Sequence, residues 1–469
     1  MPIQPISFGL ESRPGRYGAE GGASLVNAFV EEMSPDGKAP VTIYCRPGLS
    51  SFAALTGSGG FRGAIKLGPL AYVVSGPIVN RVDQTGAVAN VGAFVGSSPV
   101  RMARNRKSPN AQIALVSDGQ RAILENDTLS TIADADLPPP NDVCSIGGYF
   151  VFSTPDGRYF WTSIDEGTQI DALDFASAEA NPDGLVGIID RNQEIVLLGE
   201  ETTEFHALTG SSAVFERVQQ TTLQLGWLSG AAVKSINGIP IGPASDGTVR
   251  VLADYSPERV STHEVERDIR ALSDPGVLTG GTFSLDGHQF YCLNSPTWTW
   301  VCDLLTRKWF QWKSYGSSRW RGEGFVDIDD KLCVGDYENA VLYCLEADGQ
   351  TDAGDPLVWD LTSGPIGGYP NRIIADELYL EFIPGVGLNS TDKHASDPKV
   401  MLRVSTDDGK TWSDEMVADL GGIGEFKTEV SFRRLGMSGR EGFRFRVSVS
   451  APVSRALLRA SLRYTEAAA

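Results

Sequence analysis

Short apolar runs separated by turn residues recur along most of the chain. In each unit a short apolar strand meets a turn of Gly, Asn or Asp, and a second, more hydrophobic strand follows and ends at another turn. Asn-Gly and Asp-Gly pairs favour hairpins because a type I′ turn needs positive φ at both central residues. The pattern predicts seven hairpins, with central turns near residues 68, 109, 147, 191, 237, 286 and 329.

The spacing of these turns is nearly constant. The mean step is about 43 residues, which is the repeat length of a four-stranded propeller blade. Further turns at Asp118-Gly119, Asp156-Gly157 and Asp246-Gly247 lie where a second strand should reverse into a third. We therefore predict an all-β protein in which residues 59–350 form a β-propeller of about seven blades. Stacked sandwiches with accidental spacing are the alternative.

Two segments lie outside this repeat. Residues 1–58 mix polar and Gly-rich stretches with one apolar run, Leu25–Val30, and we expect an N-terminal arm that packs on something else. The pattern of residues 351–469 predicts a separate antiparallel β-sandwich. Its expected strands are Ile373–Phe382, Val400–Val404, Phe443–Val449 and Ala456–Tyr464. The polar stretch Ala347–Asp355 is the expected linker.

One motif in the predicted sandwich has a known shape. The stretch Ser405-Thr406-Asp407-Asp408-Gly409-Lys410-Thr411-Trp412 matches the Asp-box pattern S-x-D-x-G-x-T-W of sialidase propellers. There the acidic side chain and the glycine shape a tight hairpin with the tryptophan packed beneath it. The motif occurs once, and no spacing singles out the two carboxylates that a glycosidase needs. It therefore predicts a hairpin and not a reaction.

Residue types that carry chemistry show no catalytic or metal-binding pattern. The histidines lack metal-ligand spacing; they are His206, His263, His288 and His394. The cysteines contain no C-x-x-C pair and indicate buried free thiols; they are Cys45, Cys144, Cys292, Cys302, Cys333 and Cys344. Cys292 with Cys302, and Cys333 with Cys344, could instead face each other across adjacent strands. We predict no catalytic, cofactor-binding or metal-binding residue, no cofactor, and no enzyme activity.

Two local clusters have competing interpretations. The stretch 298–312 could stack a sugar or a single-stranded base; its aromatic residues are Trp298, Trp300, Trp309, Phe310 and Trp312, around Arg307-Lys308. The alternation of Trp298 and Trp300 favours packing in a β core. The strongest basic run, Arg101–Lys107, is short, and we expect it to meet an acidic neighbouring subunit or solvent instead of DNA.

The charge balance limits the classes of partner. The chain has 469 residues, with 40 Lys and Arg against 59 Asp and Glu, for a net charge of −19. This balance opposes sequence-independent binding to nucleic acid, which depends on clustered cations. The first residues carry no secretion signal, and no apolar stretch approaches the roughly 20 residues that span a bilayer. We expect a protein made in the cytoplasm without membrane insertion.

The middle of the chain resembles a known family. The resemblance rests on Asn181-Pro182-Asp183-Gly184-Leu185-Val186-Gly187, the strand Glu194–Leu198, and the stretch Thr203–Gly210. It extends to Leu25–Ala28 with Cys45–Leu49, and to the hairpin Thr406–Gly409. In these segments the chain resembles the packaged-DNA stabilisation proteins of short-tailed bacteriophages, which are tail hub or nozzle proteins.

The resemblance implies a structural virion protein of the phage tail. Such a protein is expected to form a ring, a homohexamer, that closes the portal channel and stabilises packaged DNA. The implied partners are the portal adaptor protein, the tail needle or plug, and tail spikes or fibres. Double-stranded DNA would pass through the lumen without sequence-specific binding, and acidic walls would let it slide. The alternative function is a carbohydrate-binding or glycoside-hydrolysing β-propeller that acts on host surface glycans through the aromatic stretch 298–312.

Overall fold

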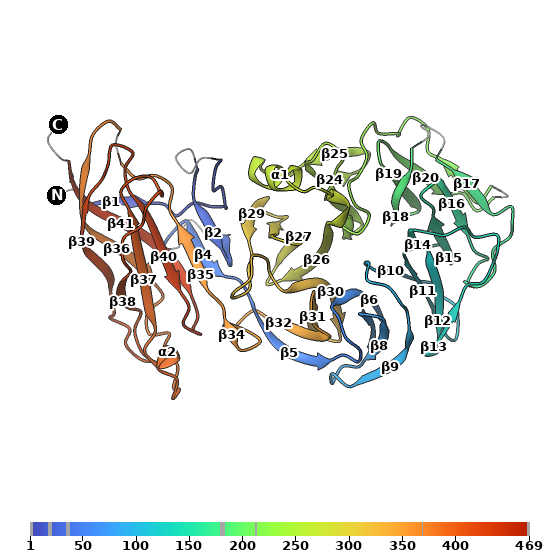
Figure 1. Cartoon of the computed structure of the whole chain (residues 1–469), viewed down its shortest axis with the longest axis horizontal. Coiled ribbons are helices and arrows are strands. Elements are labelled where there is room, and N and C mark those ends of the chain that lie inside the picture. The colour runs from blue at the N-terminus through green and yellow to red at the C-terminus, as the bar shows by residue number, and fades with distance from the viewer. Residues whose placement is uncertain are drawn as a thin grey trace. The chain divides into compact units, whose positions relative to one another are not determined.

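Nearly all regular structure in the chain is β-strand (Figure 1). The computed structural model describes residues 3–16, 21–33, 38–178, 183–211, 213–367 and 369–466. The chain forms two compact units. Unit 1 comprises Met1–Ser50, Thr297–Trp320 and Glu346–Ala469, and unit 2 comprises Ser51–Pro296 and Arg321–Leu345. The prediction of an all-β protein is confirmed.

Most sheets of unit 2 are antiparallel and consist of strands that follow one another in sequence. Five have four strands: β6–β9 (Phe61–Leu67, Leu70–Ser75, Ile78–Val82, Val88–Ala93), β10–β13 (Arg101–Arg104, Gln112–Ser117, Gln120–Glu125, Thr128–Thr131), β14–β17 (Asp142–Ile146, Tyr149–Ser153, Arg158–Trp161, Phe175–Ser177), β18–β21 (Leu185–Arg191, Glu194–Gly199, Thr203–Leu208, Phe215–Arg217) and β22–β25 (Lys234–Ile236, Ile239–Pro243, Val249–Ala253, Ser256–Arg259). The hairpin β26–β27 (Thr279–Leu285, His288–Asn294) and the strands β30–β32 (Gly322–Ile328, Lys331–Asp336, Val341–Glu346) follow.

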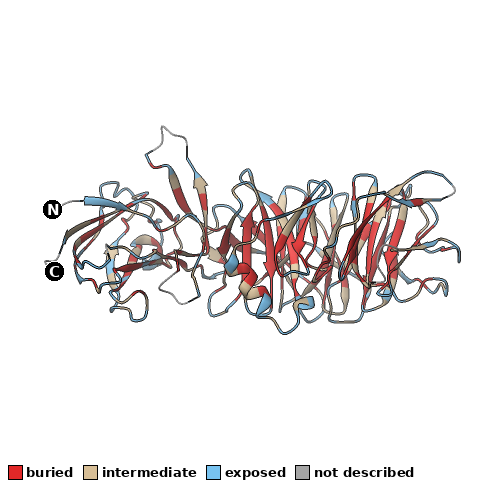
Figure 2. Ribbon diagram, turned by 90° about the horizontal axis from the view of Figure 1, so that it is seen from above, coloured by how far each residue is buried: buried red, intermediate tan, exposed pale blue. Residues whose placement is uncertain are grey.

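The first strands of these seven groups form a closed circle. Strand β6 contacts β10, β10 contacts β14, and β14 contacts β18, which contacts β23 of the next hairpin. The circle continues from β22 to β26 and β30, and β30 returns to β6. Buried residues of successive sheets form shared apolar clusters, and Figure 2 colours most of these strands as buried. This radial order is that of a β-propeller, and all seven predicted hairpins are present.

Turn chemistry explains why the chain reverses at these points. Asn237 and Gly238 have φ of 52° and 77°, and Asp286 and Gly287 have φ of 50° and 83°. Both central residues of each turn thus occupy the left-handed region, as a type I′ hairpin requires. The turn Asp118-Gly119 between β11 and β12 has the same conformation. The Asn-Gly and Asp-Gly signals of the sequence therefore specify these reversals through local backbone conformation.

Glycines allow the inner strands to approach closely. A Cβ on Gly63 of β6 would lie 2.4 Å from the carbonyl oxygen of Val100, just before β10. A Cβ on Gly324 of β30, where φ is 68°, would lie 2.3 Å from the ring of Phe61 in β6. The second contact lies where the last sheet meets the first. Small residues at these positions thus permit the ring to close.

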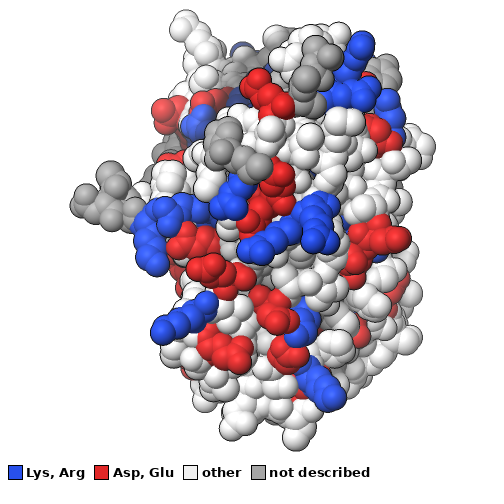
Figure 3. Space-filling view, turned by 90° about the vertical axis from the view of Figure 1, so that its left-hand side faces the viewer, with Lys and Arg blue, Asp and Glu red and all other residues white. Residues whose placement is uncertain are grey.

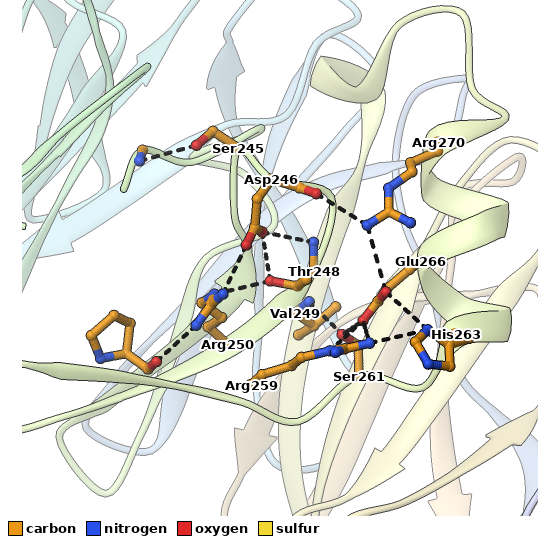
Figure 4. A network of polar contacts seen from close by, with 12 residues as sticks. Ser245, Asp246, Thr248, Val249, Arg250, Arg259, Ser261, His263, Glu266 and Arg270 are labelled. Carbon is orange, nitrogen blue, oxygen red and sulfur yellow. Dashed lines mark hydrogen bonds and ion pairs between the residues drawn. The ribbon is translucent and has the colours of Figure 1, made fainter. Parts of the chain in front are cut away.

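Helix α1 (His263–Arg270) is an insertion between β25 and β26, and Figure 4 shows how it is fastened. The Glu266 side chain is 2% exposed and accepts hydrogen bonds from Arg259 Nε at 2.6 Å and Ser261 Oγ at 2.8 Å. Arg270 reaches Glu266 at 3.5 Å and donates to the carbonyl of Asp246 at 3.2 Å. The helix is therefore tied to the predicted Asp246-Gly247 turn of its own sheet.

Unit 1 contains two sheets. One has the order β3 (Ala28–Glu32), β4 (Val41–Cys45), β41 (Ala456–Glu466), β36 (Ile373–Phe382), β39 (Val430–Met437), with β1 (Ile3–Ile6) also paired to β41. Within unit 1 the other has the order β28 (Thr299–Asp303), β29 (Lys308–Gln311), β2 (Ser24–Val26), β35 (Trp359–Thr362), β40 (Arg444–Val449), β37 (Lys399–Ser405), β38 (Met416–Asp419). Strand β5 (Gly48–Ala54), the short β33–β34 pair (Thr351–Asp352, Asp355–Pro356) and α2 (Lys393–Ser396) complete the regular elements, with a short 3-10 turn at Pro275–Val277 in unit 2.

Strands from the N-terminal region are part of these two sheets. Strand β2 pairs with β35 and β29, and β1 and β4 both pair with β41. Trp359 on one sheet meets Phe382 on the other edge to face, with ring centroids 6.0 Å apart. This packing of two sheets over an apolar core is that of the predicted β-sandwich.

Acidic and basic side chains are intermixed on the outward face of unit 1 shown in Figure 3. Glu377 on β36 pairs with Arg463 at 3.0 Å and Arg433 at 2.7 Å, and Glu381 pairs with Arg459 at 2.6 Å. The hydrogen bond from Tyr379, and then that from Arg433, lower the pKa of Glu377. Because the charges pair across strands, this face presents no extended field of one sign.

Candidate functional site

A buried arginine lies at the centre of unit 1. Arg46, which follows β4, forms a two-pronged ion pair with Asp352, with Nη1 to Oδ1 at 2.9 Å and Nη2 to Oδ2 at 2.5 Å. Both side chains are 0% exposed. The other N–H groups of Arg46 donate to Asn27 Oδ1 at 2.9 Å and to the carbonyls of Pro47 and Lys313 at 2.9 and 3.3 Å. All five guanidinium donors are therefore satisfied.

Two tryptophans flank this guanidinium. Its central carbon lies 5.6 Å from the ring centroid of Trp312 and 5.5 Å from that of Trp320, and both rings are fully buried. The two indoles meet each other at 89° with centroids 5.0 Å apart. Cation–π attraction adds to the ion pair in a site from which water is excluded.

Asn27 completes the cluster. Its φ is 57°, a conformation that Asn tolerates better than most residues. The side-chain oxygen accepts from Arg46 and from the backbone N–H of Lys313 at 2.8 Å, and the amide nitrogen donates to the carbonyl of Val358 at 2.8 Å. Three segments far apart in sequence thus meet at one polar point. We call Asn27, Arg46, Trp312, Trp320 and Asp352 the arginine node.

The arginine node joins two stretches that carry the family resemblance. These are Leu25–Ala28 and Cys45–Leu49, and the structure brings Asn27 and Arg46 into direct contact. Their role is structural, since the node has no exposed group that could meet a ligand. In the resembling stretch that runs from Asn181 to Gly187, the residues Asn181 and Pro182 lie outside the described residues. Asp183 accepts hydrogen bonds from the backbone N–H groups of Glu201 and Thr202 and shapes a turn.

The aromatic stretch 298–312 lies in the core. Trp300, Trp309, Phe310 and Trp312 are 0% exposed. Trp298 is half-buried. The interpretation as core packing is confirmed, and the structure offers no stacked aromatic surface here for a sugar or a base. The glycan alternative depended on this surface and loses its support.

The Asp-box segment forms the predicted hairpin. Asp407 accepts from the backbone N–H of Thr411 at 2.8 Å and from its hydroxyl at 2.6 Å, and Gly409 N–H donates to Ser405 Oγ at 2.7 Å. The hydrogen bonds from Thr411 lower the pKa of Asp407 to about 2. Arg444 holds the neighbouring Asp408 at 2.6 Å. Asp407 is thus engaged in the turn itself, and Asp408 pairs with Arg444 of β40.

Two of the four cations in the basic run Arg101–Lys107 are paired with acids of the same unit. Arg101 pairs with Asp142 of the next blade at 2.7 Å, and Lys107 pairs with Glu125 and Glu166 at 3.0 Å. The expectation of an acidic neighbouring subunit is wrong for these two residues, because the acids come from the same unit. Arg104 and Arg106 are exposed, as the solvent interpretation predicted.

Charged side chains converge at one end of the ring of inner strands. Asp142, at the start of β14, binds Arg101 at the start of β10 and accepts from Ile188 N–H of β18 at 3.2 Å. Thr279 of β26 donates to Glu323 of β30. These contacts brace neighbouring blades around the axis.

Lys234, at the start of β22, lies among these groups. Reasoning from the sequence did not single it out; like Arg101 and Asp142, it is the first residue of its strand. Burial, followed by repulsion from Arg101, lowers the pKa of Lys234 to about 7. No hydrogen bond or ion pair joins it to another described residue. The ring therefore encloses a cation that solvent still partly reaches.

The histidines and cysteines have structural environments. His206 forms hydrogen bonds with Tyr159 and Glu204 in the core, and His263, His288 and His394 lie on other elements or loops.

All six cysteines are free, and only Cys45 is not fully buried. Cys333 and Cys344 do face each other across β31 and β32, with sulfurs 4.0 Å apart. In the part of the chain that the structure describes, no group of three or more His, Cys, Asp or Glu could hold a metal ion.

Comparison with known families matches both parts of the fold. The family described as bacteriophage P22 Gp10, β-propeller, matches residues 23–350, and that described as bacteriophage P22 Gp10, β-sandwich, matches residues 366–463. The chain belongs to the bacteriophage P22 Gp10 family. It is 24% identical over 396 residues to the tail hub protein gp10 of Salmonella phage P22, covering 78% of this chain and 80% of that one. The resemblance inferred from the sequence is confirmed.

The family assigns the protein to the phage tail. Homology to P22 gp10 supports a role as a tail hub protein of the virion. Solved structures are more distant: the WD40 propeller of Doa1 has 9% identity and a TM-score of 0.42 over 64% of this chain and 97% of its own. The designed protein Ika8 has 12% identity and a TM-score of 0.39 over 63% and 99%. None of the described helices is long and apolar enough to span a membrane.

Proposed function

We propose that this protein is a ring-forming tail hub, or nozzle, that closes the portal channel after packaging and stabilises the packaged DNA. It would also form the conduit for DNA and the docking platform for tail spikes or fibres. The observation that carries the proposal is the match to the P22 Gp10 family over both the propeller and the sandwich. The expected neighbours are further copies in a homohexamer, a portal adaptor protein and a tail needle or plug.

The two β units suit a mechanical role. The propeller is a closed circle of sheets, and such radial repetition leaves only short, protected sheet edges. In unit 1 the arginine node ties three chain segments together without an exposed group. Rigid bodies of this kind present fixed surfaces to neighbours, which a symmetric ring requires.

The charge distribution suits a conduit for DNA. The net charge is −19, and two of the cations in the strongest basic run are paired with acids of the same unit. Without a stripe of unpaired cations, phosphate groups find no deep electrostatic minimum. DNA would therefore move along such a surface without being held, and we propose that the acidic groups line the lumen.

A complementation experiment tests the proposal. Phage particles assembled without this protein would be purified and mixed with the isolated chain, and nuclease-resistant DNA per head, the tail image and infectivity would be measured. The expected result is retained DNA and a six-fold density at the tail, with infectivity restored. Particles that retain DNA equally well without the chain would contradict the stabilising role. A sample with hydrolase activity on host glycans would contradict the non-enzymatic one.

A further inference from the structure

Two cysteines of the last blade face each other. Cys333 on β31 and Cys344 on β32 are directly opposite in the register of this antiparallel pair, and their sulfurs lie 4.0 Å apart. Opposed residues of antiparallel strands have Cα atoms about 4.5–5.5 Å apart, a separation that a disulfide can bridge. The sulfurs can therefore reach the bonding distance of about 2.05 Å by side-chain rotation, without a change of strand register.

The pair lies in the apolar cluster that joins the last blade to the first. Cys333 is 0% and Cys344 is 9% exposed. The same cluster contains Ala71 and Val73 of β7 in the first blade and Ala53 of β5. Strand β5 is the next neighbour of β32 in the sheet order, so β32 lies between β31 and a strand from the N-terminal part of the chain. A bond from β31 to β32 would fasten the strand on which this sheet closes.

The redox environment of the protein changes when the virion is released. Homology to a tail hub protein places the chain in the virion. The bacterial cytoplasm, where a phage protein is made, keeps thiols reduced, whereas disulfides form and persist on virion surfaces. The same two thiols thus meet first a reducing medium and then an oxidising one.

Burial slows the oxidation of the pair, and proximity favours its completion. The hydrogen bond with Cys344, and then burial, raise the pKa of the Cys333 thiol. Because the thiolate is the reactive form, the buried pair resists rapid oxidation. Once one sulfur is oxidised, however, the other lies 4.0 Å away and reaches it without diffusion. We therefore expect the pair to stay reduced in the cell and to oxidise during the longer life of the particle outside it.

We propose that Cys333 and Cys344 form a disulfide in the released virion and so lock the last blade of the propeller. The oxidant is hydrogen peroxide. The sulfur of Cys344, the more exposed of the two, attacks a peroxide oxygen, and the O–O bond breaks to give a sulfenic acid and water. The Cys333 sulfur then attacks the sulfenic sulfur, the S–S bond forms, and the S–O bond breaks to release a second water. Two electrons pass from the sulfurs to the peroxide, and the two thiol protons leave in the water.

Peptide mapping of released virions tests the proposal. Infected cells and purified virions would be unfolded in a thiol-alkylating reagent and digested with a protease that cuts after Glu338, which separates the two cysteines. In released virions the two peptides should stay linked until a reductant is added, while in infected cells both thiols should be alkylated. Cys144, buried in the third blade, is the control and should be alkylated in both samples. Alkylation of both Cys333 and Cys344 in released virions would overturn the proposal.

Melting of the purified full chain provides the second measurement. The parent oxidised with dilute hydrogen peroxide should melt several degrees higher than the parent in dithiothreitol, because the cross-link restricts the unfolded chain. Cys333→Ala and Cys344→Ala should each abolish this difference, although both also lower the melting temperature by leaving a cavity. The matched control Cys144→Ala also removes a buried thiol and should keep the full difference. A parent without the difference, or a Cys333→Ala chain that retains it, would show that the bond does not form.

The two proposals fail separately. The disulfide rests on the location of the protein in the virion and not on the proposed ring. Reduced cysteines in released virions would therefore leave the proposed function intact, while particles that retain DNA without the chain would contradict that function and leave the disulfide untouched.

Discussion

The propeller and the sandwich unit solve the same problem, burying β-sheets, by different means. In unit 2 five sheets are each built from four consecutive strands, and their hairpins are set by local turns such as Asn237-Gly238. In unit 1 the sheets draw strands from three separate parts of the chain, and a buried ion pair joins Arg46 to Asp352 across 306 residues. Local chemistry specifies the first design, while the second depends on long-range contacts.

The difference predicts where each unit is vulnerable. A unit made of repeated hairpins tolerates a change in one turn but not an obstruction between blades, because each blade packs on its neighbours. A unit fastened at one polar point depends on that point, since a buried charge without its partner is costly.

The largest effect is expected at the arginine node. Arg46→Ala leaves the Asp352 carboxylate buried without its partner and should lower the free energy of unfolding by about 3–5 kcal/mol. Hydrogen exchange followed by mass spectrometry should show the loss of protection in unit 1 peptides and not in unit 2. Arg459→Ala, which removes an exposed pair with Glu381, is the control and should cost less than about 1 kcal/mol. Equal loss in both units would contradict the comparison.

A smaller effect is expected where the ring closes. Gly324→Ala adds a methyl group against the ring of Phe61 and should cost about 3 kcal/mol, from strain at positive φ together with overpacking. Gly287→Ala also has positive φ but no atom within 4 Å of the added Cβ, so it should cost about 1 kcal/mol. Thermal unfolding of the two variants separates the packing contribution from the backbone one. Equal melting temperatures would mean that the blades do not press together here.

A pH-dependent effect is expected at Lys234. Its folded pKa of about 7 lies below the ordinary value near 10.4, so the unfolded chain binds more protons between these values and stability rises with pH there. Lys234→Met removes the enclosed charge and should be more stable than the parent at pH 7, with the difference vanishing near pH 10. Chemical denaturation of both proteins at several pH values measures this. A constant difference would show that Lys234 is not titrating.

The smallest effect is expected at the Asp-box hairpin. Because the folded pKa of Asp407 is about 2, below the ordinary value near 3.9, its carboxylate stabilises the fold above about pH 4, and this contribution is lost as the pH falls to 2. Asp407→Asn should therefore be less stable than the parent at pH 6 and similar to it at pH 2. Melting curves across this range test the expectation, and Asp414→Asn, at an exposed acid beyond the turn, serves as the control.

The sequence predicts unit 2 far better than unit 1. Asn-Gly and Asp-Gly turns act within a few residues, so their spacing revealed the hairpins and the propeller directly. The Asp-box turn was predictable for the same reason, as was the burial of alternating aromatics at Trp298 and Trp300. Arg46 gives no local sign of its partner, because nothing in the sequence identifies Asp352 among 59 acidic residues. Lys234 was not predictable either, because only three of the seven first strands begin with a charged residue and no local pattern marks this one as half-buried.

The contact of β30 with β6 also constrains how the protein is made. The first inner strand leaves the ribosome more than 250 residues before the one that must lie beside it. The contacts of Asn27 with Val358 and of Arg46 with Asp352 form later still, because Val358 and Asp352 are synthesised after β30. The nascent chain must therefore carry an open arc of blades and an unfinished N-terminal segment through most of translation, and it becomes a finished part only when its last quarter emerges.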